Sequence, residues 1–516
     1  MYFPFIQQLN KQKIICNSKM LNLDKNRYID KIYRKSADLT YQQEYGYQDK
    51  QSDNQNSQEE SNEEQEDDKW ERRHYKFQNE SKQYCKSVYE DIKLQKANDV
   101  YIFEQNPQKI NHKLLTHKEN YIIYERKDNL LKAINKIMLF QEQNNLIDYH
   151  PNINSISGQI KELVQEKMKN RKTNYYPQEE DEEKEQQQQN TADIVKVRNI
   201  IHQSLQPYHK DYIKSDQSKQ IEAYFKEIKE YQGIDQWGKQ YKTSQSEFLW
   251  LPAVFKYSKK KKMYEIEGKL FNLLEKCPDI DELKLELNHL MTYFSTPLQQ
   301  THDYFKKLEY KISNEFNYDR IKILDNKSKV NFSQQIHAIV KISEIEIAPK
   351  STYSGKWHVE GFSSDNILYT CLYVIEHDEN LVDGKLKFKR TPRSDDDPCG
   401  GSQMQSAHQY CPSYNHLCDP HKLIPLGSLD IKENLMIIFP NQNIHKVKGI
   451  KNVTDKPLKR KIVVFFVVNH KDQPYTINDV EFTKPLEFIK EYRLRDMYER
   501  SLNKQTEAQS FDYCEH

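Results

Sequence analysis

The sequence of 516 residues predicts an α+β chain, with a helical N-terminal half and a C-terminal jelly-roll barrel. Three observations lead to this prediction. Apolar residues recur at helical spacing over much of the chain before about residue 334. Short strand-like runs separated by turn residues replace them from about residue 335. Seven of the 12 glycines lie between residues 355 and 449, where short strands need tight connections.

The N-terminal part alternates between low-complexity and helical stretches. Residues 41–68 and 177–190 are rich in Gln, Asn and acidic residues and contain almost no aliphatic side chains, so we expect them to be disordered. Residues 1–40 form an N-terminal segment. Between the two low-complexity stretches, residues 69–176 are predicted to be mainly helical because their apolar residues repeat with the helical period.

Residues 191–334 are predicted to form a second helical region that flanks the barrel. The segment "DIVKVRNIIHQSLQPY" at its start is interpreted as at least partly helical, and residues 279–317 contain the amphipathic run "DELKLELNHLMTYF". Four consecutive lysines at 259–262 suggest either a phosphate-binding patch or a solvated loop. A loop is the better interpretation in a chain with little net charge.

Residues 335–475 are predicted to form the barrel itself, and residues 476–516 a C-terminal helix and tail. The strand-like runs are "QQIHAIVKISEIEIAP", "NILYTCLYVIE", "GKLKFKR", "NLMIIFP" and "RKIVVFFVVN". Their polar, Gly- and Pro-containing connections favour antiparallel β-structure over βαβ units.

Composition excludes several classes of protein. The chain has 78 Lys and Arg against 77 Asp and Glu, so it lacks the basic field that nucleic-acid binding requires. Its mean hydropathy is −0.98, and neither a signal peptide nor an apolar run near 18 residues is present, so we expect no membrane partner. Its eight cysteines are irregularly spaced. We therefore expect an intracellular protein, cytoplasmic or nuclear, with reduced thiols.

Three polar residues in the barrel region have the chemistry of a metal site. His358 and Glu360 lie two apart, so on extended chain both side chains point to the same face. His445 follows the apolar run "LMIIFP". Two histidines and one carboxylate form the facial triad of non-haem Fe(II) oxygenases, which leaves positions open for a cosubstrate and dioxygen. Each residue alone is more often an ordinary surface or core residue, and the order and strand context together favour the metal site.

A cation follows the three residues along the chain. Arg460 opens "RKIVVFFVVN", the most hydrophobic strand-like run in the sequence. Its planar guanidinium can bind a carboxylate with two hydrogen bonds, which suits the distal carboxylate of 2-oxoglutarate. A solvated strand end is the alternative interpretation of this arginine.

The same segments resemble a known family. "STYSGKWHVEG", "GKLKFKR", "LGSLDIKENLMIIFPNQNIHKV" and "LKRKIVVFFVVN" resemble the 2-oxoglutarate/Fe(II) dioxygenase-like double-stranded β-helix, and in particular a family of domains of unknown function, number 4246 in the DUF series. The residues that match its motifs are Gly355, Trp357, His358, Glu360, Gly361, Phe439, Pro440, Asn441, His445, Val447, Arg460, Lys461 and Ile462. The resemblance covers roughly residues 195–500 and is most specific between 350 and 470.

The resemblance implies the roles of the site residues. His358, Glu360 and His445 would hold Fe(II), and Arg460 would bind the cosubstrate 2-oxoglutarate. Tyr373 would be a second contact to the cosubstrate, with a core or rim tyrosine as the alternative. Glu360 is one methylene longer than the more usual Asp, which changes the geometry without preventing binding. The implied activity is hydroxylation of an unknown substrate by a 2-oxoglutarate-dependent dioxygenase.

Other interpretations stay open. The chain could be a non-catalytic jelly-roll protein that keeps the fold for binding or as a scaffold. It could also be a cupin-like metal enzyme without 2-oxoglutarate, although Arg460 would then have no role. Residues 399–421 contain three cysteines and three histidines, but their spacing matches no standard zinc signature, so we favour a long insertion over the site rather than a zinc site. Neither the substrate nor the oligomeric state follows from the sequence.

Overall fold

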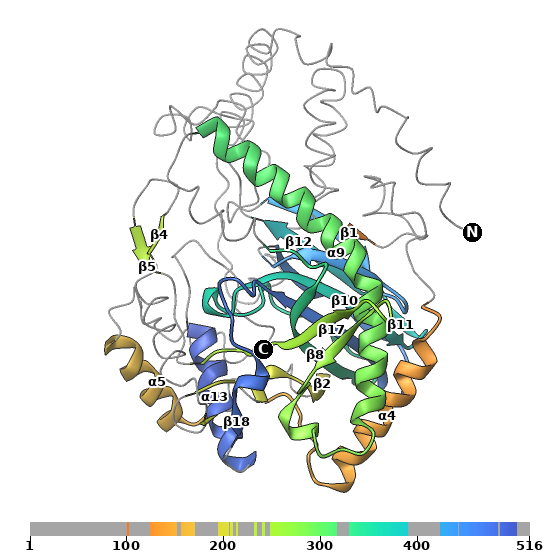
Figure 1. The fold of residues 1–516 in the computed structure, drawn as a ribbon. Coiled ribbons are helices and arrows are strands. Elements are labelled where there is room, and N and C mark those ends of the chain that lie inside the picture. The colour runs from red at the N-terminus through yellow and green to blue at the C-terminus, as the bar shows by residue number, and fades with distance from the viewer. Residues whose placement is uncertain are drawn as a thin grey trace, which may run out of the picture. The chain divides into compact units, whose positions relative to one another are not determined.

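We analysed a computed structural model of the chain. It describes residues 124–151, 156–170, 194–205, 248–316, 330–390, 424–441, 443–482 and 486–502, with short stretches at 101–102, 207–209, 213–214, 232–234 and 240–242. The chain divides into two compact units, and all the described residues belong to the unit of residues 93–391 and 423–516. This unit combines helices with mostly antiparallel sheets (Figure 1).

The largest sheet has eight strands, and every strand pair in it is antiparallel. The order along the sheet is β1-β14-β10-β17-β8-β6-β7, and β2 also pairs with β8. The strands are β1 (Tyr101–Ile102), β2 (Val195–Ile201), β6 (Ala253–Ser258), β7 (Met263–Glu267), β8 (Gln335–Ile347), β10 (Ile367–His377), β14 (Met436–Pro440) and β17 (Leu458–Val468). Valine, isoleucine and phenylalanine dominate β17, as expected for a central strand buried on both faces.

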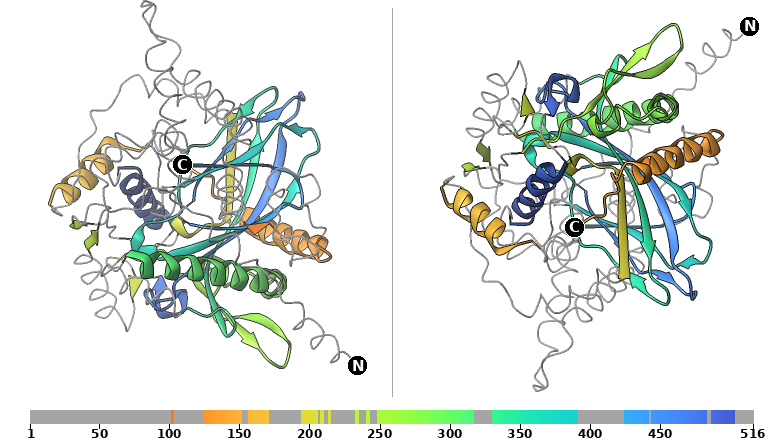
Figure 2. Two further views of the ribbon diagram at one scale, coloured as in Figure 1. Left: turned by 90° about the horizontal axis from the view of Figure 1, so that it is seen from above. Right: turned by 90° about the horizontal axis from the view of Figure 1, so that it is seen from below.

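One face of the large sheet, here called the helix face, packs against α4 (Lys127–Gln143) and α9 (Ile280–Phe316). Both helices lie along the same side of the sheet (Figure 2). Their apolar residues repeat at helical spacing, so each presents one stripe to the strands. On β10, the residues that join this core are Tyr369, Cys371, Tyr373 and Ile375.

The opposite face, here called the inner face, packs against a three-stranded sheet. That sheet has the order β13-β12-β15 and consists of β12 (Lys385–Arg390), β13 (Ile424–Asp430) and β15 (Ile444–Lys448). Leu386 and Phe388 of β12 share a core with Val374 of β10 and Leu458 of β17. Because side chains alternate along a strand, these contacts establish which residues of each strand point inward.

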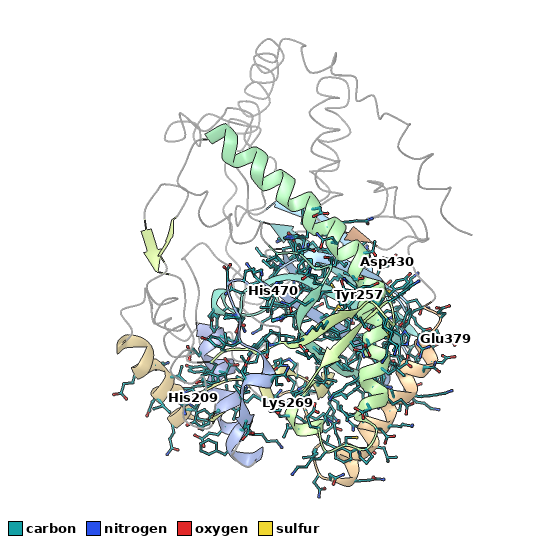
Figure 3. All side chains as sticks on the ribbon, viewed as in Figure 1. His209, Tyr257, Lys269, Glu379, Asp430 and His470 are labelled. Atoms are coloured by element: carbon teal, nitrogen blue, oxygen red, sulfur yellow. The ribbon has the colours of Figure 1, made fainter. Side chains whose placement is uncertain are left out.

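Smaller elements complete the unit (Figure 3). They are α5 (Gly158–Asn170), α13 (Leu486–Leu502), β3 (Ile213–Lys214), β4 (Gln232–Ile234), β5 (Gln240–Lys242), β9 (Thr352–Tyr353), β11 (Leu381–Val382), β16 (Ile450–Asn452) and β18 (Glu481–Phe482). Trp250 packs on the inner face against Ile339, Phe466 and Val468. The segment around Trp250 therefore covers part of that face.

The structure corrects the helical prediction for the start of the region 191–334. Residues 195–201 form strand β2, which pairs with β8, and β6 and β7 extend the same sheet. In β2, Val197 packs on the inner-face core whereas Ile200 and Ile201 join the helix-face core. A strand buried on both faces loses the alternation of polar and apolar residues that identifies a strand in a sequence.

Other predictions have mixed outcomes. Helices lie within residues 127–143, 158–170, 280–316 and 486–502 as expected, and the lysines at 259–262 form a turn. Residues 1–40, 41–68, 177–190 and 399–421 lie outside the described residues. Among the helices that the structure describes, none has the length and apolar character needed to cross a membrane.

Candidate metal centre

His358 and His445 are brought together by the backbone. The amide of His358 donates to the carbonyl of His445 (3.0 Å), and the amide of His445 donates to the carbonyl of His358 (2.9 Å). Such a reciprocal antiparallel bridge aligns the two residues directly opposite each other. Their ring centroids lie 4.2 Å apart, so the two imidazoles are neighbours although 87 residues separate them in the sequence.

Main-chain carbonyls orient both rings. Nδ1 of His358 lies 2.9 Å from the carbonyl oxygen of Lys356, and Nδ1 of His445 lies 3.1 Å from that of Asn443. With the hydrogen on Nδ1 donated to the carbonyl, Nε2 presents its lone pair as the ligand atom. The same arrangement at both histidines is what a pair of metal-binding imidazoles requires.

Asn441 holds the backbone of Glu360 in place. Its side-chain nitrogen donates to the Glu360 carbonyl (2.6 Å), and its side-chain oxygen accepts from the Glu360 amide (3.2 Å). The chain then turns at Gly361, whose φ of +68° is a conformation that favours glycine. A Cβ at this position would also lie 2.8 Å from the Asp365 carboxylate and from Ile367. The glycine is therefore needed for the turn that follows Glu360.

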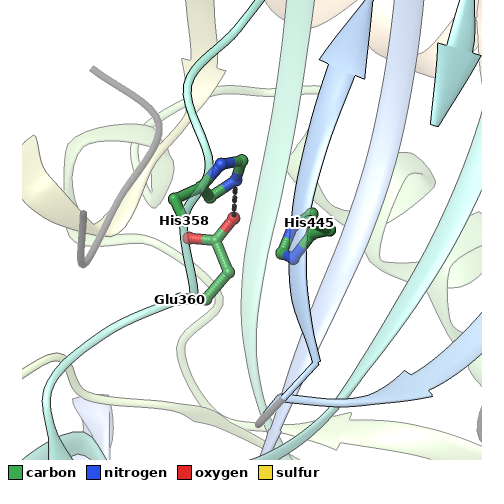
Figure 4. Close-up of side chains that lie close together, drawn as sticks. All are labelled: His358, Glu360 and His445. Carbon is green, nitrogen blue, oxygen red and sulfur yellow. Dashed lines mark ion pairs between the residues drawn. The ribbon is translucent and has the colours of Figure 1, made fainter. Parts of the chain in front are cut away.

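The three side chains form a compact donor set (Figure 4). Nε2 of His358 lies 3.6 Å from Oε1 of Glu360, and one donor atom from each of His358, Glu360 and His445 lies within 4.8 Å of the others. Two donors on one ion, each about 2.1 Å from it, lie about 3 Å apart when adjacent and about 4.2 Å apart when opposite. All three residues are buried, so a small approach of the side chains would complete a metal site.

Electrostatics favour the ionised form of Glu360. Burial by itself raises the pKa of this carboxyl, but the positive charge of Lys341 and the contact with His358 outweigh it, with a smaller contribution from His445. The net effect lowers the pKa of Glu360 to about 2. The carboxylate is therefore negatively charged at neutral pH, as a metal ligand must be.

Arg460 lies on the inner face near one end of β17. It pairs with Ile345 of β8 and His377 of β10, and it is 3% exposed. Leu458 and Ile462, two residues away on either side, both contact the inner-face core. Burial, followed by the charge of Arg460, lowers the pKa of His377 to about 4. The guanidinium is thus buried on the inner face, which packs against the smaller sheet that carries the candidate ligand His445.

Tyr373 does not join this set of residues. It lies on the helix face, where its ring meets that of Tyr124 edge to face with centroids 5.9 Å apart. Its hydroxyl donates to the side chain of Asn434 (3.3 Å), and burial raises its pKa. On β10 the inward positions are its neighbours Leu372 and Val374. Alternation along the strand turns Tyr373 away from the site, so we leave it out of the proposed site.

Sequence reasoning missed two residues of the site. Asn441 was recognised only as part of a motif, and the sequence offers no sign of its contact with Glu360. Lys341 occupies an inward position on β8 between Ile339 and Ser343. A lysine at an apolar position of a strand was a signal that the sequence contained.

A buried ionic network supports the turn after Glu360. Asp365 accepts from the amides of Phe362 (2.8 Å) and Trp250 (2.9 Å) and from the guanidinium of Arg500 (2.7 Å). Arg500 also donates to Asp496 (2.8 Å), and its guanidinium lies 4.0 Å from the ring centre of Trp250. Helix α13 is therefore tied to the loop that carries the candidate metal ligand Glu360.

Comparison with known proteins gives one family match. A model of the family "Protein of unknown function (DUF4246)" matches residues 275–480, which include the three candidate ligands and Arg460. Helix α13 lies beyond the matched region. No curated protein shows significant sequence similarity to the chain.

Several solved structures are similar at low identity. An oxidoreductase of the 2OG-Fe(II) oxygenase family from Burkholderia pseudomallei is 10% identical, with 31% of this chain and 58% of that chain covered and a TM-score of 0.17. The Fe(II)/(alpha)ketoglutarate-dependent dioxygenase TqaL is 10% identical, with 69% and 94% covered and a TM-score of 0.22.

EvdO2 from Micromonospora carbonacea var. aurantiaca, solved in complex with 2-oxoglutarate, is 12% identical over 29% of this chain and 57% of that chain, with a TM-score of 0.15. At TM-scores this low, these likenesses carry no weight for the function of the present chain, which rests on its own residues.

Proposed function

We propose that the chain is a 2-oxoglutarate- and Fe(II)-dependent dioxygenase that hydroxylates a substrate still to be identified. The observation that carries the proposal is the buried set of His358, Glu360 and His445, with both imidazoles oriented by carbonyls. Two imidazoles and one carboxylate are the donors that this class of iron centre uses.

The sheet topology supports a double-stranded β-helix. The large sheet contains the run β14-β10-β17-β8, and the smaller sheet β13-β12-β15 faces it, with His358 bridged to β15. In this arrangement His445 lies on the smaller sheet, while Arg460 projects from the larger one. The candidate ligand His445 and the cation Arg460 thus come from the two sheets that share the inner-face core.

Each residue would have a distinct task. His358, Glu360 and His445 would hold Fe(II), which together with 2-oxoglutarate supplies the oxidising chemistry for a C–H bond. Arg460 would bind the distal carboxylate of 2-oxoglutarate and so orient it. Asn441 would keep the Glu360 backbone in place. Burial of all these groups excludes bulk water from the centre.

Anaerobic absorbance spectroscopy tests the proposal. Wild-type protein loaded with Fe(II) and 2-oxoglutarate should show the charge-transfer band of the iron–cosubstrate complex, and in air it should form succinate. His358→Ala should lose both signals. His470→Ala is a matched control because His470 lies outside the ligand set. The absence of the band in iron-loaded wild type would contradict the proposal, and a band that survives in His358→Ala would contradict the assignment of the ligands.

A further inference from the structure

The three candidate ligands are held in position by different means. His358 and His445 face each other across two reciprocal backbone hydrogen bonds, which fix the position of one relative to the other. Glu360 follows this bridge by two residues and lies at a bend outside the strands. Its position therefore depends on its contacts with Asn441 and on the turn that comes after it.

Asp365 organises the turn after Glu360. Its Oδ2 accepts from the amide of Phe362 (2.8 Å) and from Nη1 of Arg500 (2.7 Å). The amide of Asp365 donates back to the carbonyl of Phe362 (3.0 Å), which closes the turn. One carboxylate is therefore shared between the backbone of this turn and a side chain of α13.

The guanidinium of Arg500 is held from several sides. Its Nε donates to Asp496, one helical turn earlier on α13 (2.8 Å), and its centre lies 4.0 Å from the ring centre of Trp250 and 4.6 Å from that of Phe362. The indole nitrogen of Trp250 also donates to Asp496 (3.0 Å). The side chains of Asp365, Asp496 and Arg500 are all 0% exposed. A planar cation between two rings and two carboxylates has little freedom to reorient, so it holds Asp365 in a defined place.

A second buried arginine of α13 provides an internal comparison. Arg493, seven residues before Arg500, is buried to the same extent and pairs with Asp148 (2.5 Å). Its Nε donates to the hydroxyl of Ser204 (3.2 Å). Asp148 precedes β2 and Ser204 follows it, so neither of these two partners belongs to the turn after Glu360. The two arginines thus share a helix and a degree of burial but support different segments.

We propose that Arg500 is a positioning residue for the metal centre. Through Asp365 it fixes the turn that places the Glu360 carboxylate, so that helix α13 sets the affinity of the site for its metal. Groups that orient metal ligands typically change metal affinity by about 10- to 100-fold. The support of the metal centre then extends beyond residues 275–480, the region that matches the family. This inference rests on the metal site of the proposed function.

Co(II) titration of the full-length protein, followed by visible absorbance, tests the inference. Co(II) binds to the imidazole and carboxylate donors that suit Fe(II), and its spectrum depends on how the ligands are arranged. Arg500→Met should weaken Co(II) binding about tenfold or more and change the spectrum, because the Glu360 carboxylate is placed less precisely. Arg500→Lys should restore the affinity only in part, since an ammonium group lacks the planar fork that serves both carboxylates.

Arg493→Met is the matched control, because it removes an equally buried arginine from the same helix. Both Arg→Met substitutions should lower the midpoint of thermal unfolding, but only Arg500→Met should weaken Co(II) binding. The titrations are made well below the lowest of these midpoints, so that every protein is folded. Equal losses of Co(II) affinity in the two variants, or no loss in Arg500→Met, would overturn the inference.

Hydrogen exchange of the metal-free protein gives a second measurement that does not depend on a bound ion. The amides of Phe362 and Asp365 both donate within the turn, so Arg500→Met should make them exchange faster. Arg493→Met should leave their exchange closer to that of wild type. If these amides exchange equally fast in wild type and in Arg500→Met, Arg500 does not hold the turn and the inference is wrong.

Failure of this inference can be distinguished from failure of the proposed function. A wild-type protein that binds Co(II) but shows no charge-transfer band with Fe(II) and 2-oxoglutarate would contradict the proposed function and leave the role of Arg500 intact. A wild-type protein that shows the band, with Co(II) affinity unchanged in Arg500→Met, would contradict only the inference. If wild type binds no Co(II), both proposals fail.

Discussion

The two faces of the large sheet differ in chemistry although the same strands supply both. On the helix face, Tyr373, Val463 and Phe465 pack in the apolar core with α4 and α9, and the charge of Lys461 on the same face is ion-paired with Glu344 and Glu376. On the inner face, the charged Lys341 and Arg460 interrupt the aliphatic residues. Apolar packing and paired charges suit a face whose task is stability, whereas cations at inward positions of a strand can serve a ligand. The comparison teaches that strand phase, more than proximity in sequence, separates site residues from core residues.

The largest expected effect comes from the buried ionic network of Asp365, Asp496 and Arg500. Asp365→Ala should lower the free energy of unfolding by about 3–5 kcal/mol, because it leaves the buried guanidinium of Arg500 without one of its carboxylates. Metal affinity should fall as well, since Asp365 supports the turn after Glu360. Urea unfolding and Co(II) titration measure the two effects. Asp383→Ala, which removes an exposed ion pair with Lys451, should change stability by less than about 1 kcal/mol.

A lower pH should reduce the free energy of unfolding, because His337 on the inner face then becomes protonated more easily in the unfolded chain than in the folded one. Burial, followed by the charges of His470 and Lys471, lowers the pKa of His337 from 6.5 to about 4. Between these pH values the unfolded chain binds a proton that the folded chain does not, so stability falls as the pH decreases from about 6.5 to about 4. The loss amounts to about 3 kcal/mol.

Urea unfolding of the metal-free protein across this pH range measures the loss. His337→Gln should show a correspondingly shallower pH dependence than wild type. Parallel pH profiles for the two proteins would show that His337 is protonated as easily in the folded state as in the unfolded state.

Substitutions of Arg460 and Lys461 compare two adjacent residues of β17 that point to opposite faces of the large sheet. Arg460→Met should weaken 2-oxoglutarate binding about 10- to 100-fold and leave metal affinity unchanged, because the lost interaction is a charge-assisted hydrogen bond to the cosubstrate. Lys461, the next residue, pairs with Glu344 and Glu376 and points the other way. Lys461→Met should therefore reduce stability without changing cosubstrate affinity. If the two substitutions changed the affinity for 2-oxoglutarate equally, Arg460 would not be a specific ligand of the cosubstrate.

The smallest effect is expected for Tyr373→Phe. The substitution removes a hydrogen bond to Asn434 on the helix face, so it should change the free energy of unfolding by about 1 kcal/mol. The affinity for 2-oxoglutarate, measured from the charge-transfer band, should equal that of wild type. A tenfold loss of affinity for 2-oxoglutarate would show that Tyr373 does contribute to cosubstrate binding.

The sequence was informative where a pattern has one structural meaning. Amphipathic periodicity predicted α4, α5 and α9. The order of His358, Glu360, His445 and Arg460 singled out the residues that the structure places in the donor set and on the inner face. Periodicity failed at β2, which is apolar on both faces. It also could not tell on which face Tyr373 lies, because both faces of β10 carry apolar residues and alternation alone does not say which face packs against the helices.

Contacts between segments that are distant in the sequence could not be predicted. Asp365 meets Arg500 across 135 residues, and Asn441 meets Glu360 across 81. Such pairs depend on which strands become neighbours, and no local propensity encodes that information. The contact of α13 with the turn after Glu360 follows from the tertiary structure alone.

The backbone bridge between His358 and His445 has a consequence for folding. An ion bound by both imidazoles would link two positions that are 87 residues apart in the sequence, as a disulfide bond links two cysteines. A cross-link that closes a loop of this length lowers the entropy of the unfolded chain by an amount equivalent to about 4–5 kcal/mol. Metal loading would thereby raise the free energy of unfolding of the whole unit, and the ion would hold the segment of His358 beside strand β15 of the smaller sheet as well as serving the proposed chemistry.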